Sequence, residues 1–92
     1  MAISDELIRR ELLQIVVEAA GVGAGRMQSP GLLQEAVDRL GIRRDSEDEL
    51  ALLDVWQELF TEGILAWGHD VHNANPPFMH VTRKGRVQLG IS

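Results

Sequence analysis

The chain has 92 residues, no cysteine and a formal net charge of −5, with 9 Lys+Arg against 14 Asp+Glu. This length allows one small domain with a modest core, which excludes a multidomain enzyme with a deep pocket. The lack of cysteine excludes disulfides, thiolate nucleophiles and zinc–cysteine sites, and the negative charge argues against a general binder of polyanions. No apolar run is long enough for a signal peptide or a membrane span, so we expect a cytoplasmic protein. We expect a single, non-enzymatic domain spanning 1–92, with no cofactor.

The N-terminal part of the chain predicts two helices. Apolar residues recur in steps of three and four over about 4–20, a period typical of an amphipathic helix, and Gly21 is expected to end it. The next helix is expected over about 29–40, with Ser29 as its N-cap. The glycine-rich stretch 21–25 between them is expected to form a flexible loop.

A third helix is expected over about 46–62. Ser46 and Glu49 have the spacing of a capping box, in which each side chain accepts a hydrogen bond from a free backbone amide. The apolar residues of this helix cover so much of its circumference that both of its sides are expected to be buried. The expected core takes residues from all three helices: Leu12, Ile15, Leu33, Val37, Leu53, Trp56 and Phe60.

The apolar period then changes from helical to alternating, which predicts a β-hairpin over about 64–82. So short a hairpin cannot bury both faces in a small domain, so one face is expected to act as an association surface unless the first helix covers it. The alternation gives two candidates for that face. One is Trp67 with Phe78, and the other is Met79 with Val81.

Three helices followed by a hairpin resemble the winged helix-turn-helix family. The likeness rests on the helix-to-strand junction and on the end of the hairpin: Leu59, Gly63, Ile64 and Leu65, and the run Val81-Thr82-Arg83-Lys84-Gly85-Arg86, which is similar to the leucine-threonine-x-x-glycine ending of many bacterial winged-helix regulators. The resemblance implies an α+β, three-helix winged helix-turn-helix fold with a C-terminal two-stranded β-hairpin, the wing. It also implies that the third helix would lie in the major groove of DNA.

The charge of the third helix opposes that role. Residues 45–62 include seven acidic and no basic residues, whereas 1–44 are neutral and 63–92 carry a charge of +2. Contacts with phosphates supply most of the non-specific affinity for DNA, so an acidic helix lacks the usual driving force for binding.

Asp54, Glu58 and Glu62 form an acidic ridge on this helix, because each follows the last by four residues. Two interpretations stay open. Either the ridge binds a basic partner, or it is solvated or neutralised by arginines of the same domain: Arg39, Arg43, Arg44 or Arg86. The first interpretation predicts a protein-interaction module whose contacts are the ridge and three hairpin residues: Trp67, Phe78 and Met79. Its partner would be a protein with a basic or apolar surface, including a second copy of the chain.

Two other functions are considered. One is a DNA-binding transcriptional regulator that contacts phosphates through the wing and through five basic residues: Arg43, Arg44, Arg83, Lys84 and Arg86. Arg83, Lys84 and Arg86 are expected to lie in a short helical turn over 83–89, which Thr82 would cap. The other function is a small-ligand sensor with Trp56 and Trp67 lining a cleft. No metal is expected, because His69 and His72 are three residues apart and would point to opposite faces of a strand.

Overall fold

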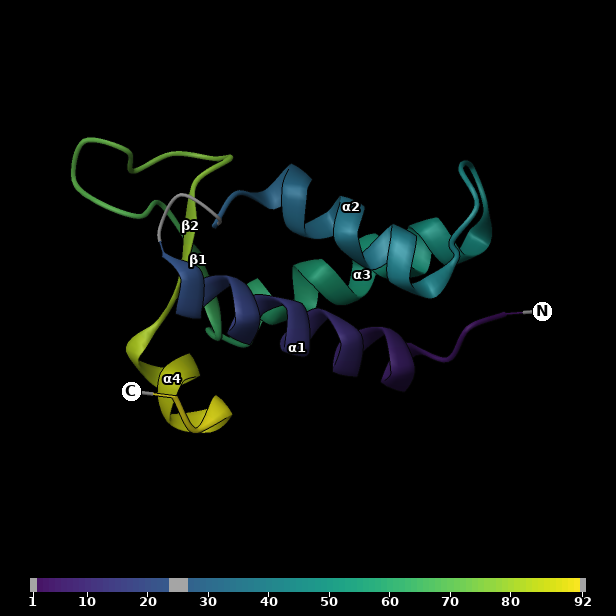
Figure 1. Ribbon diagram of the computed structural model, residues 1–92, viewed down its shortest axis with the longest axis horizontal. Helices are drawn as coiled ribbons and strands as arrows, with labels where there is room; N and C mark the ends of the chain where they lie inside the picture. Colours follow the sequence, from purple (N-terminus) through teal and green to yellow (C-terminus); the bar gives the residue numbers. More distant parts are fainter. Residues whose placement is uncertain (1, 24–26, 92) are drawn as a thin grey trace.

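The computed structural model describes residues 2–23 and 27–91, and it has an α+β architecture with a two-stranded antiparallel sheet. Figure 1 shows α1 and α2 side by side along the long axis, with the hairpin and α4 together at one end. The elements in chain order are α1 (Asp5–Val22), α2 (Ser29–Leu40), α3 (Glu47–Thr61), β1 (Leu65–Trp67), β2 (Met79–Val81) and α4 (Arg83–Leu89). The predicted α+β class is confirmed. The described residues form four helices: the three expected before the hairpin, and α4 where a short helical turn over 83–89 was expected. None of these helices combines the length and the hydropathy needed to cross a membrane.

The core lies between the first three helices and one face of the hairpin. Its largest fully buried side chains come from all of these elements: Ile8, Leu12, Ile15, Val16, Leu32, Leu52, Val55, Leu59, Ile64, Leu65 and Met79. Of the predicted core residues, Leu12, Ile15 and Trp56 are buried, and three more are half-buried at its edge: Leu33, Val37 and Phe60. The prediction for Leu53 was wrong, because this side chain is 45% exposed.

The end of α1 and the N-cap of α2 differ from the prediction, whereas α2 spans the expected residues 29–40. Helix α1 continues past Gly21 and is capped by Gly23, which adopts the positive φ of 141°. Residues 24 and 25 of the predicted glycine-rich loop lie outside the described residues. Gln28 occupies the N-cap position of α2 without a side-chain cap hydrogen bond, so the prediction that Ser29 is the N-cap was wrong.

Ser29 has a different role, as a buried hydrogen-bond acceptor in the core. Its Oγ accepts a hydrogen bond of 3.2 Å from the indole Nε1 of Trp56. Trp56 has only 5% of its surface exposed, so water does not satisfy this donor. The bond therefore ties the first turn of α2 to the middle of α3.

The start of α3 agrees with the prediction. Ser46 Oγ accepts a 3.2 Å hydrogen bond from the backbone N–H of Glu49. The Glu49 carboxylate reaches back and accepts from the N–H of Asp45 at 3.1 Å, one residue earlier than a standard capping box would place it. The first turn of α3 is thus held from both directions.

The hairpin is shorter than predicted, with three residues in each strand and a long loop between them. Residues opposite each other share a face, and the pairs are Leu65 with Val81, Ala66 with His80, and Trp67 with Met79. Trp67 therefore lies on the face of Met79 that packs against the helices, and the expected pairing of Trp67 with Phe78 was wrong. Before α2, the Met27 carbonyl accepts a 3.1 Å hydrogen bond from Met79 N–H, which adds a third extended segment beside β2.

Helix α4 closes over the junction between α3 and β1. Thr82 Oγ1 accepts a 2.8 Å hydrogen bond from Gly85 N–H, as the predicted cap requires, and it also donates to the Gly63 carbonyl. Gly85 is required for this close packing, because a Cβ at this position would overlap the carbonyl oxygen of Ile64.

Candidate interaction surface

Helix α3 packs against the core with one side only. Its buried residues are Leu52, Val55, Trp56 and Leu59. On the opposite side, Leu50 is 63% and Leu53 is 45% exposed. The expectation that both sides of this helix would be buried was therefore wrong, and two large apolar side chains are left in contact with solvent.

Aromatic residues extend this exposed apolar side toward the hairpin. The ring of half-buried Phe60 stacks on Trp67, with centroids 4.3 Å apart and an interplanar angle of 25°. Trp67 is 41% exposed at the end of β1. At 100° per residue, Leu50, Leu53 and Phe60 fall within about 80° of one another around the α3 axis. Together with Trp67 they form an apolar strip, which the exposed Gln57 interrupts between Leu53 and Phe60.

Two acidic side chains flank this strip. Asp54 and Glu58 are exposed and lie one helical turn apart on the side of Leu50 away from Leu53. Neither forms an ion pair with any residue that the structure describes. We call the apolar strip and this acidic flank the α3 surface: Leu50, Leu53, Phe60, Trp67, Asp54 and Glu58.

The third residue of the predicted ridge, Glu62, is already engaged. Its two carboxylate oxygens accept hydrogen bonds of 2.6 and 2.8 Å from the Arg9 guanidinium, which lower the pKa of the Glu62 carboxyl. The Nζ of Lys84 donates a 3.0 Å hydrogen bond to the Glu62 backbone carbonyl. Glu62 therefore links α1 and α4 to the end of α3, and Arg9 offsets its charge.

The arginine that neutralises the ridge is not one of those considered from the sequence. Arg9 pairs with Glu62 at one end of the ridge, whereas Arg39 pairs with Glu18 at 2.7 Å and with Glu35 at 3.0 Å. The neutralised interpretation thus holds for Glu62, and the charge of Glu58 also helps to raise the pKa of the same arginine.

The five basic residues considered for DNA binding do not form one surface. Arg43 and Arg44 lie in the loop between α2 and α3, whereas the other three belong to α4: Arg83, Lys84 and Arg86. Figure 1 shows that loop and α4 at opposite ends of the molecule, whose longest dimension is 41 Å. The hairpin loop 68–78 between the strands contains no lysine or arginine. A phosphate backbone would therefore meet two separated basic groups.

Two of the hairpin residues predicted for partner binding lie away from the α3 surface. Met79 is fully buried in the core, so it is not accessible to a partner. Phe78 is half-buried and packs on the ring of His69, with centroids 4.7 Å apart. Only Trp67 joins the exposed strip. Phe60 contacts both tryptophans that were predicted to line a ligand cleft, and its ring centroid lies 5.6 Å from that of Trp56.

The histidines help to hold the hairpin loop. His80 Nδ1 lies 2.6 Å from the Gly68 carbonyl oxygen, and His69 Nε2 lies 3.7 Å from a carboxylate oxygen of Asp70. Asp70 also accepts hydrogen bonds from its own turn, and the bond from the Asn73 amide is the main cause of its lowered pKa. Within residues 2–23 and 27–91, no three side chains are arranged to hold a metal ion.

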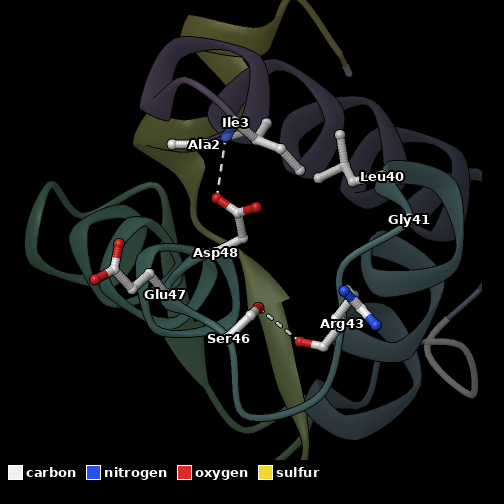
Figure 2. Close-up of a pocket in the computed structure, with 8 residues that line it drawn as sticks. All are labelled: Ala2, Ile3, Leu40, Gly41, Arg43, Ser46, Glu47 and Asp48. Atoms are coloured by element: carbon white, nitrogen blue, oxygen red, sulfur yellow. Dashed lines mark hydrogen bonds between the residues drawn. The ribbon is translucent and has the colours of Figure 1, made fainter.

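A cleft of about 460 Å³ lies at the other end of the molecule. Its walls are the N-terminal segment, the end of α2 and the start of α3: Ala2, Ile3, Leu40, Gly41, Arg43, Ser46, Glu47 and Asp48. Figure 2 shows Asp48 turned toward the backbone nitrogen of Ile3, which donates a 3.0 Å hydrogen bond to it. Ser46 Oγ likewise donates to the Arg43 carbonyl at 2.6 Å. Asp48 and Ser46 therefore tie neighbouring chain segments together at the walls of the cleft.

Leu50, Leu53 and Phe60 were missed as candidate site residues. The available signal was the breadth of the apolar stripe on the third helix, which was interpreted as burial on both sides. The α3 surface thus combines three predicted contacts, Asp54, Glu58 and Trp67, with three unpredicted ones. No protein-family model, curated protein or solved structure matches this chain.

Proposed function

We propose that this domain is a non-enzymatic, winged-helix-type module that binds a protein partner through the α3 surface. The observation that carries the proposal is the exposure of Leu50 and Leu53, at 63% and 45%, on a helix whose other side builds the core. Fully burying a leucine side chain contributes about 1.5–3 kcal/mol, so covering both residues would provide a substantial part of a binding free energy.

The order of the elements supports the winged-helix part of the proposal. Three helices precede an antiparallel hairpin, and α3 runs into β1 with only three residues between them. Helix α4 follows the hairpin and packs on the α3–β1 junction. A cytoplasmic location stays a prediction from the sequence.

The α3 surface does not support a role for α3 as a helix that binds in the major groove of DNA. Its outward side carries the carboxylates of Asp54 and Glu58, which would repel phosphates. Duplex DNA binding at low salt that is lost in Arg83→Ala and Lys84→Ala would instead favour the regulator alternative.

The test is an affinity capture that compares matched variants of the intact chain. Leu50→Ser/Leu53→Ser removes the apolar centre of the α3 surface, and Val22→Ser/Val87→Ser is the control because those valines are 69% and 78% exposed elsewhere. Scaling full leucine burial by the exposed fractions gives a loss of about 1.6–3.2 kcal/mol, which weakens binding about 15- to 200-fold.

We expect partner proteins to be retained by the wild type and by the valine control, and to be lost with the leucine double variant. Circular dichroism would establish that both variants stay folded. A capture profile that is identical for all three chains would overturn the proposed function.

A further inference from the structure

We infer that the partner covers the α3 surface with a basic amphipathic helix. This inference rests on the proposed function and specifies the chemistry of the partner. It is supported by the shape of the apolar strip, by its acidic flank and by the charge of a second copy of the chain.

The shape of the strip favours a helix over an extended peptide. Leu50 and Phe60 are ten residues apart on α3, so the strip runs about 15 Å along the helix axis before it reaches Trp67. The backbone amides and carbonyls of α3 are used within the helix itself, so an extended peptide would find no main-chain partners there. A helix satisfies its own backbone and can place apolar residues at i, i+3 or i+4, and i+7 along the strip.

The acidic flank selects a basic occupant. Asp54 and Glu58 are one turn apart and form no ion pair among the described residues, although the charge of Glu58 also acts on Arg9. Lysines or arginines spaced by four residues on a partner helix can face both carboxylates. An acidic helix on the same strip would place like charge beside the carboxylates of Asp54 and Glu58. A neutral helix would partly desolvate these carboxylates without compensating their charge.

The charge argues against a second copy of this chain as the occupant. Pairing two α3 surfaces would bring together two segments, 45–62, that each carry seven acidic and no basic residues. Arg43 and Arg44 do not offset this repulsion, because residues 43–49 contain four acidic side chains against these two arginines.

The test uses three synthetic helical peptides with the same apolar pattern and with lysine, glutamine or glutamate at the flank positions. Isothermal titration calorimetry measures their binding to the intact chain. We expect the lysine peptide to bind about 3- to 10-fold more tightly than the glutamine peptide, and the glutamate peptide to bind most weakly. This preference should vanish in Asp54→Asn/Glu58→Gln and persist in the control Glu6→Gln/Glu11→Gln on α1.

The possible results separate this inference from the proposed function. Equal binding of all three peptides, lost in Leu50→Ser/Leu53→Ser, would retain the α3 surface and overturn the basic partner. Binding that the leucine double variant does not weaken would overturn both. Failure of the lysine peptide to bind at about 1 mM would overturn the inference. The inference would also be overturned if sedimentation equilibrium showed the wild type to be a dimer and Leu50→Ser/Leu53→Ser to be a monomer.

Discussion

Replacement of Ser29 by alanine would remove the acceptor of a buried indole N–H. Ser29 Oγ accepts from Trp56 Nε1 at 3.2 Å, and the two residues are only 9% and 5% exposed. Water cannot substitute for the lost oxygen at such a site, so the indole donor would stay unsatisfied. Helix capping would not change, because Gln28 and not Ser29 is the N-cap of α2.

The cost of leaving a buried donor unsatisfied is about 1–3 kcal/mol of unfolding free energy. For a domain of 60–100 residues, each kcal/mol lowers the melting temperature by about 4–8 °C, so Ser29→Ala is expected to melt about 4–24 °C below the wild type. Ser29→Asp should be less stable still, because it would place a carboxylate in the core. Aspartate would serve as well as serine if position 29 were an N-cap.

The assay is urea-induced unfolding followed by circular dichroism for wild type, Ser29→Ala, Trp56→Phe and the double variant. We expect Ser29→Ala to cost less in the Trp56→Phe background, where no indole donor remains. An equal cost in both backgrounds would refute the assignment of this hydrogen bond. A Ser29→Asp variant as stable as the wild type would contradict the burial of position 29.

Two further predictions concern packing and pH. Gly85→Ala is expected to lose about 1–3 kcal/mol of unfolding free energy because its Cβ would overlap the Ile64 carbonyl. Gly31→Ala, where nothing lies within 4 Å, is expected to gain about 0.5–1 kcal/mol, and equal thermal shifts for the two variants would contradict this packing. Since Arg9 lowers the pKa of Glu62, the stabilisation by that carboxylate is complete above its usual pKa of 4.5 and is lost as pH falls through the folded-state value. The difference in stability between wild type and Glu62→Gln should therefore shrink in urea titrations below pH 4.5, and a pH-independent difference would contradict the ion pair.

Features set by nearby residues could be predicted from the sequence. The cap of α3 depends on Ser46 and Glu49, three positions apart, and the cap of α4 depends on Thr82 and Gly85 in the same way. The change of apolar period after α3 indicated the hairpin for the same reason. Such signals lie within one turn or one strand, so no knowledge of the rest of the fold is needed.

Features set by distant residues could not be predicted. Apolar spacing shows which side chains of α3 are apolar, but whether Leu53 is covered depends on what packs beside the helix. Strand alternation groups Met79 with Val81, yet the pairing register decides that Trp67 lies on their face. The contact between Arg9 and Glu62 spans 53 positions, and no local pattern indicates it.

Phe60 contacts two tryptophans that differ in exposure, one in the core and one at the surface. Trp56 is 5% exposed, whereas Trp67 is 41% exposed, and both touch the same phenylalanine ring. A water-soluble quencher would therefore reduce the fluorescence of Trp67 while leaving that of Trp56 largely intact. A partner bound at the α3 surface would shield Trp67 from the quencher, and unfolding would expose Trp56. The chain thus has two intrinsic probes that separate binding from unfolding in a single sample.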